Sequence, residues 1–197
     1  MDRICSDDSF TRALDRFVER LEPHALANSL AQVALKLCMP GVPDIYQGNE
    51  VRTFALADPD NRRAVGFGEL RRSLHALSSD DGAWRSRELT KLWVTHQGLR
   101  LRAERPLAFV GERAGYAPVE ATGPHQANVV GFVRGGDVAV AVTRFSTQIG
   151  QGWGETEVAL PDGSWHDILT ARVHRRRALA SELFADLPVV LLRREPA

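Results

Sequence analysis

The chain has 197 residues, of which 44% are hydrophobic and 25% are charged, proportions that are ordinary for a soluble globular protein. Lysine plus arginine and aspartate plus glutamate both number 25, so the net charge is zero. That balance gives no electrostatic reason to expect nucleic acid or a membrane surface as a partner. No segment has the apolar length of a signal-peptide core or a membrane span. We therefore expect a cytoplasmic protein.

The cysteines and histidines give no sign of a metal site. Cys5 and Cys38 are the only cysteines and have no CxxC spacing, which favours a reduced, cytoplasmic setting. The six histidines show neither HxxxH nor HxH spacing. We expect the protein to need no metal and no other cofactor.

Helical periodicity dominates the first hundred residues. Asp7 is among the N-cap candidates of the first helix, and Pro23 is expected to break that helix. Pro40 and Gly41 are expected to end the second helix. The predicted helices cover residues 10–21, 26–37, 67–77 and 87–102.

One short buried strand is predicted from Val42 to Tyr46, because this apolar run is bounded by glycine and proline. Pro43 has no backbone N–H and suits the start or the edge of a strand. Parallel α/β folds collect their active-site groups in the loops at the carboxyl ends of strands. The loop from Gln47 to Arg63 is therefore the expected position of ligand-binding groups.

The pattern changes at Arg105-Pro106, where the helical period ends. The run "VVGFVRGGDVAVAVTRF" (residues 129–145) predicts a hairpin that turns at Gly135-Gly136. The runs "TEVALP", "SWHDILT" and "LPVVLLRR" predict further strands, a series typical of an antiparallel β-sandwich. We therefore expect an α/β segment with one strand over residues 1–105 and an all-β domain over residues 106–197.

The loop after the predicted strand is rich in groups that bind hydroxyls. Carboxylates come from Asp44 before the loop and from Glu50, Asp58 and Asp60 within it, and guanidinium groups come from residues that include Arg62 and Arg63. Sugar hydroxyls need acceptors and donors in fixed directions, so this set suits a polyol ligand. A plain turn explains part of the same set, because Asp58 and Asn61 can bond their own backbone and Pro59 presets a turn dihedral.

Three motifs stand out in this region: "NSLAQVALKL" (residues 28–37), "PGVPDIYQGNE" (residues 40–50) and "DPDNRR" (residues 58–63). Together they resemble the maltooligosyltrehalose synthase family of the alpha-amylase superfamily. The second motif is similar to the last barrel strand of that superfamily and its loop. The runs "KLWVTHQGLRLRAERP" and "WGETEVALPDGSWHDILT" extend the resemblance over nearly the whole chain.

The resemblance implies a fold made of the C-terminal end of a (β/α)8 barrel, with one strand and its helices, followed by an antiparallel β-sandwich domain. It implies an isomerase that turns the reducing-end α-1,4 bond of a maltooligosaccharide into an α,α-1,1 bond by retaining intramolecular transglycosylation. Such chemistry needs two carboxyls about 5–5.5 Å apart. The family carries its catalytic carboxylates in motifs upstream of "NSLAQ", and residues 1–27 contain none of them. We therefore expect no catalytic residue in this chain.

A complete barrel needs about 250 residues, so the resemblance also implies a C-terminal portion: a fragment, a truncated gene or one half of a split enzyme. The expected partners are a maltooligosaccharide substrate and, for a split enzyme, a chain carrying the rest of the barrel. Two other functions stay open. One is a non-catalytic glucan-binding remnant, and the other is a fragment of an alpha-amylase-type hydrolase.

Six residues receive secondary roles from the resemblance. Tyr46 is expected to line the glucose subsite, with the barrel core as its alternative place. The residues expected to shape the sugar-binding rim or to orient upstream carboxylates, with an internally bonded loop as the alternative, are Asp58, Asp60, Asn61, Arg62 and Arg63. The sequence departs from the family where Val51-Arg52 replace a usual tryptophan after "YQGNE", and where "LEPHALA" is shorter than the usual connection.

Overall fold

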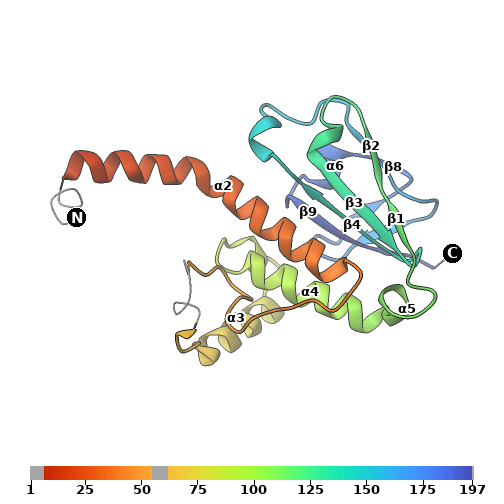
Figure 1. Cartoon of the computed structure of the whole chain (residues 1–197), viewed down its shortest axis with the longest axis horizontal. Coiled ribbons are helices and arrows are strands. Elements are labelled where there is room, and N and C mark those ends of the chain that lie inside the picture. Colours follow the sequence, from red (N-terminus) through yellow and green to blue (C-terminus); the bar gives the residue numbers. More distant parts are fainter. Residues whose placement is uncertain (1–6, 55–61, 197) are drawn as a thin grey trace.

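The computed structural model describes residues 7–54 and 62–196 (Figure 1). Its helices are α2 (Asp8–Cys38), α3 (Phe67–Ser79), α4 (Thr90–Glu104), α5 (Pro106–Phe109) and α6 (Ala180–Leu183), with short 3-10 turns η2 (Ala83–Arg85), η3 (Gln126–Asn128) and η4 (Ser146–Gln148). Its strands are β1 (Tyr116–Pro118), β2 (Glu120–Thr122), β3 (Val129–Arg134), β4 (Val138–Thr143), β5 (Glu157–Ala159), β6 (Trp165–Asp167), β7 (Val173–His174), β8 (Arg177–Leu179) and β9 (Val189–Arg194).

Helix α2 begins where the sequence predicts. The Asp7 Oδ1 atom accepts hydrogen bonds from the backbone N–H groups of Ser9 (2.8 Å) and Phe10 (3.3 Å), as an N-cap carboxylate does. Asp8 adds a negative charge in the first turn, at the positive end of the helix dipole.

The prediction that Pro23 ends this helix is wrong. Helix α2 runs through Pro23 for 31 residues, although a proline in a helix interior costs about 3 kcal/mol. Contacts on both sides of Pro23 offset that cost. Glu22 is bonded to Arg52, and Leu30 and Leu37 are completely buried in the core. The helix propensity of a single segment does not include contacts with distant residues, so these contacts could not be predicted from the local sequence.

The prediction of a buried strand from Val42 to Tyr46 is also wrong. These residues have no regular secondary structure, and 94% of the surface of Val42 is exposed. A parallel strand exists only when neighbouring strands pair with it. Within the described ranges, every strand belongs to one of two antiparallel sheets formed after residue 115, and none lies beside residues 42–46.

The helices that follow agree with the sequence. Helix α3 covers the predicted range and continues to Ser79, while α4 begins three residues later than predicted and ends at Glu104. Helix α4 packs against α2. Gly98 lies at this crossing, where an added Cβ would come within 2.6 Å of the Leu37 Cδ1 atom. The absence of a side chain there lets the two helices approach closely.

Two antiparallel sheets form the second half of the chain, as the alternating runs predict. The larger sheet has the order β1-β3-β4-β9-β6-β7, and the smaller one has the order β2-β5-β8. Strands β3 and β4 form the predicted hairpin, with Arg134 opposite Val138 in the register. Gly135 and Gly136 in its turn have positive φ angles of 55° and 69°, which glycine adopts without strain.

The larger sheet lies between helix α2 and the smaller sheet, so its strand β4 is buried on both faces. Its valines, such as Val140, belong to the same hydrophobic cluster as Leu30 and Leu37 of α2. Its alanines, such as Ala141, belong to a second cluster with Val158 of the smaller sheet. A strand covered on both sides reads as a continuous apolar run, which explains "VAVAVT".

The junction at Arg105-Pro106 is a change of structure within a shared core. Arg105 is the C-cap of α4, and Pro106 begins α5. Helix α2 contacts both β4 and β9 across this junction. The division into residues 1–105 and 106–197 stays a prediction about how the two parts unfold.

Candidate functional site

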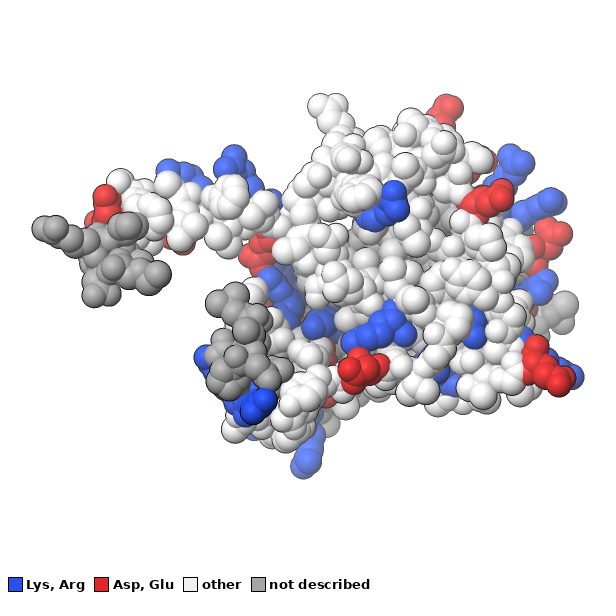
Figure 2. Space-filling model, in the orientation of Figure 1, with Lys and Arg blue, Asp and Glu red and all other residues white. Residues whose placement is uncertain are grey.

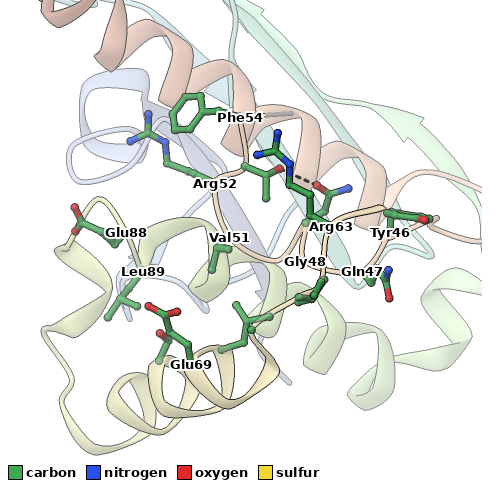
Figure 3. A pocket seen from close by; sticks show the side chains of 17 residues that line it. Tyr46, Gln47, Gly48, Val51, Arg52, Phe54, Arg63, Glu69, Glu88 and Leu89 are labelled. Atoms are coloured by element: carbon green, nitrogen blue, oxygen red, sulfur yellow. Dashed lines mark hydrogen bonds between the residues drawn. The ribbon is translucent and has the colours of Figure 1, made fainter. Parts of the chain in front are cut away.

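A cavity of about 660 Å³ lies beside the loop that follows α2 (Figure 3). Its walls come from residues 46–54, from residues 63–73 at and before α3, and from residues 88–89 before α4. Polar and aromatic side chains at its walls include those of Tyr46, Gln47, Arg52, Phe54, Arg63 and Glu69. The described residues of the loop that the sequence assigned to ligand binding therefore border a cavity.

A tight turn shapes the start of this loop. The backbone N–H of Asn49 donates to the carbonyl oxygen of Tyr46 at 3.0 Å, and Gly48 has a positive φ of 81°. This is the arrangement that demands glycine at the third turn position. Gly48 is buried against Val65, whose Cγ2 would lie 3.1 Å from an added Cβ. The turn at "YQGN" therefore fixes the path of the backbone that forms this wall of the cavity.

Ion pairs and hydrogen bonds hold residues 51–52 of the loop on the helices. Glu22 of α2 accepts from Arg52 at 2.7 Å and pairs with Arg87 at 3.3 Å. The hydrogen bond from Arg52 and, to a smaller extent, the positive charge of Arg52 hold the pKa of Glu22 below its ordinary value. Lys91 of α4 donates to the Val51 carbonyl at 3.0 Å. These contacts fix residues 51–52 between α2 and α4.

Burial affects the charges beneath the loop. It lowers the pKa of the half-buried Lys91, an effect that the nearby Glu50 carboxylate opposes. The Oε2 atom of Glu50 is buried and has no hydrogen-bond partner within the described residues. The Glu50 carboxylate therefore lies near the Lys91 ammonium group, and its place beneath the loop fits a supporting role.

The structure brings together two of the predicted site residues. Tyr46 and Arg63 both line the cavity. Arg62 is exposed and is not among the residues that line it. The other three predicted residues, Asp58, Asp60 and Asn61, lie outside the described residues. The roles assigned to all six stay predictions.

The cavity residues that the sequence interpretation did not assign to the site include Arg52, Phe54, Glu69 and Glu88. Arg52 and Phe54 lie between the recognised motifs, and the Arg52 guanidinium carbon is 5.4 Å from the centre of the Phe54 ring. Glu69 and Glu88 come from other elements, and their spacing gives no local signal. Only the packing of the three segments brings them to one cavity.

The cavity offers donors from arginine, acceptors from glutamate and faces from aromatic rings. This combination suits a ligand with many hydroxyl groups. No group of three or more histidine, cysteine, aspartate or glutamate side chains in the described part of the chain is placed to hold a metal ion. None of the helices there is long and apolar enough to cross a membrane.

The chain is homologous to synthases of trehalose derivatives. No family model matches it. It is 44% identical over 192 residues to proteins of two Mycobacterium tuberculosis strains that are named as maltooligosyl trehalose synthases. The match covers 97% of this chain and 24% of those relatives, so the chain spans about a quarter of their length.

Solved structures agree with the sequence relatives. The maltooligosyltrehalose synthase from Arthrobacter ramosus is 37% identical, has a TM-score of 0.88 and matches 98% of this chain over 25% of its own. A hypothetical maltooligosyl trehalose synthase from Sulfolobus tokodaii is 28% identical, with a TM-score of 0.72, and matches 98% of this chain over 24% of its own. The chain is thus a homologue of the C-terminal region of maltooligosyl trehalose synthase, which confirms the resemblance of the motifs.

Proposed function

We propose that this chain supplies the C-terminal portion of an enzyme that isomerises the reducing-end α-1,4 bond of maltooligosaccharides to an α,α-1,1 bond. The observation that carries the proposal is 44% identity over 97% of the chain to proteins named as maltooligosyl trehalose synthases. The cavity supports it independently, because its donors, acceptors and rings suit a sugar.

In the proposed reaction, a carboxylate attacks the anomeric carbon of the second sugar from the reducing end, and an acid protonates the departing glucose. The released glucose turns and attacks the glycosyl-enzyme through its own anomeric hydroxyl, whose proton returns to the residue that acted as the acid. This step forms the new bond and frees the carboxylate. We assign these carboxylates to the part of the relatives that precedes the matching quarter, and no catalytic residue to this chain.

The role of this chain is then to shape one side of the substrate site. Tyr46 and Arg63 are proposed to contact the sugar at the cavity, since both line it. Water must be kept from the glycosyl-enzyme, because hydrolysis otherwise competes with transfer. Residues 51–52 are suited to that purpose, because Glu22 of α2 and Lys91 of α4 hold them on both sides.

The same proposal gives the finer description of the fold. Helices α2, α3 and α4 would form the last part of a (β/α)8 barrel, and the two antiparallel sheets would form a β-sandwich domain. Two observations support it: the cavity follows the helix that carries "NSLAQVALKL", and the two sheets share a hydrophobic cluster that includes Trp153 and Trp165.

A chimera tests the function directly. This chain replaces the matching quarter of the Mycobacterium tuberculosis relative, and the chimera, the unmodified relative and the isolated chain are each incubated with maltopentaose. We expect the chimera to remove reducing ends without releasing an equal amount of glucose, and the isolated chain to leave the substrate unchanged.

The other outcomes identify the alternatives. An increase in reducing ends would indicate a hydrolase. A folded chimera that binds maltopentaose but leaves it unchanged, while the unmodified relative converts it, would indicate a non-catalytic glucan-binding portion. Either result contradicts the proposed isomerisation.

A further inference from the structure

The first half of α2 carries an apolar stripe that no described part of the chain covers. The stripe consists of Phe10, Leu14, Phe17, Val18 and Leu21, each between 44% and 50% exposed. Their spacing of three and four residues places them on one face of the helix. Figures 1 and 2 show this half of α2 extending away from the rest of the molecule.

The stripe is not an extension of the face that α2 buries in its own core. At 3.6 residues per turn, the completely buried Leu30, Ala34 and Leu37 lie roughly on the opposite side of the helix. Arg12 and Arg16 share that opposite side in the projecting half and are exposed. Helix α2 therefore presents apolar residues in two directions, and the described residues cover only one of these two faces.

The stripe leads toward the candidate site. Phe17, Leu21, Ala25 and Ser29 form one row at four-residue spacing, so each lies beside the next on the helix surface. Ala25 and Ser29 border a small cleft whose other walls include Phe54 and Lys91. Phe54 is 86% exposed and also lines the main cavity.

A second copy of the chain is a poor fit for this surface. Residues 8–21 form about 21 Å of helix, and the stripe is only one side of a cylinder about 10 Å wide. Two such stripes in contact would bury well under the roughly 1,200 Å² of total surface that specific interfaces bury. The longer relatives contain a much larger candidate, because this chain matches only 24% of their length.

We infer that the stripe is the docking surface for the polypeptide that precedes this region in the longer synthases, whether that polypeptide is joined to this chain or supplied separately. Docking also covers Phe54 and thereby closes the cavity on that side. The inference rests on the proposed function, since it takes the partner from the same relatives. It explains why a helix with five exposed apolar side chains stands clear of its own domain.

Hydrogen exchange in the chimera tests the surface. We expect the backbone amides of residues 10–21 to exchange at least tenfold more slowly in the chimera than in the isolated chain. The double variant Phe17→Glu/Leu21→Glu should restore fast exchange there and around Phe54. Arg12→Gln/Arg16→Gln lowers the net charge by the same two units on the other side of the helix and should keep the protection.

The results that overturn the inference are distinct from those that overturn the function. Equal exchange in the chimera and the isolated chain, with product still formed, would refute the docking surface but not the proposed function. Protected amides without product formation would support the docking surface but refute the proposed function. The inference is also overturned if sedimentation detects a homodimer of the isolated chain and Phe17→Glu/Leu21→Glu abolishes that homodimer. A chimera that fails to fold although its parent folds would overturn it as well.

Discussion

Arg134 of strand β3 donates a hydrogen bond of 2.9 Å from Nη1 to the carbonyl oxygen of Cys38, 96 residues earlier in the chain. The same guanidinium donates to the carbonyl oxygens of Phe109, Ala114 and Gly115. Arg134 is only 2% exposed, and its guanidinium satisfies one backbone oxygen at the end of α2 and three at and after the end of α5. One residue thus joins the helical part to the β part.

Replacing Arg134 by methionine should lower the free energy of unfolding by at least about 3 kcal/mol, since buried carbonyl groups without partners cost about 1–3 kcal/mol each. Urea denaturation at pH 7 measures the change. The matched control is Arg175→Met at an exposed position, which should change stability by no more than about 0.5 kcal/mol. A similar, small effect of both substitutions would show that Arg134 is not a structural link.

Asp167 should make stability depend on pH. Burial raises the pKa of its carboxyl from 3.8 to about 6, against the hydrogen bonds from Thr170, Leu169 and Leu191. The folded state therefore holds this proton more tightly than the unfolded state. The stabilisation is fully present below pH 3.8 and is lost as pH rises through about 6, a change of roughly 3 kcal/mol.

Asp167→Asn tests this linkage, because asparagine cannot ionise. Urea unfolding at several pH values should show the variant gaining stability relative to the unmodified chain between pH 4 and pH 7. Glu155→Gln, which replaces an exposed carboxylate in the same way, serves as the matched comparison. Parallel curves for Asp167→Asn would contradict the raised pKa.

The bond between Arg52 and Glu22 should set the acidity of Glu22. In Arg52→Ala, the pKa of that carboxyl is expected to rise toward its ordinary value of 4.5, because its largest stabilising contact is lost. Arg87→Ala removes the longer pair at 3.3 Å and should raise the pKa less. NMR titration of the Glu22 side chain measures its pKa in both variants. Equal increases would refute the expectation that Arg52 lowers this pKa more than Arg87 does.

The two arginines of "DPDNRR" should differ in importance. In an active chimera, Arg63→Ala is expected to reduce kcat/KM for maltopentaose at least tenfold, equivalent to about 1.4 kcal/mol, because Arg63 lines the cavity. Arg62→Ala is the neighbouring control and should have a smaller effect. Unchanged kinetics in both variants would favour the plain-turn interpretation of this loop.

Limited trypsin digestion should separate the projecting part of α2 from the rest. Arg12, Arg16 and Arg20 lie in its exposed half, whereas α2 is packed in the core from Ala27 onward. The resistant fragment should therefore begin before Ala27. A stable fragment that begins near Pro106 would instead show that the β domain is independent, with the boundary that the sequence suggests.

The sequence by itself determined the family, the hairpin and the start of the first helix. These features depend on short-range patterns: the motifs around Tyr46, the glycine pair at residues 135–136 and the carboxylate of Asp7. Strands β3, β4, β5, β6 and β9 were predictable because each alternating run is bounded by residues that favour turns, whereas β1, β2, β7 and β8 were not predicted. Tyr46 and Arg63 flank the same loop and both line the cavity, while their contacts with a sugar stay predictions.

Only the tertiary structure decided the rest. Helix α2 continues through Pro23 because Glu22 pairs with Arg52 and Leu30 is buried under the sheet, contacts that lie outside any local window. Val42 to Tyr46 form no strand because a strand depends on neighbours that pair with it. The cavity needs three segments from different parts of the chain, so the carboxylates of Glu69 and Glu88 gave no signal of their own. Local patterns fix local geometry, while ion pairs, sheet neighbours and cavities arise only when distant residues meet.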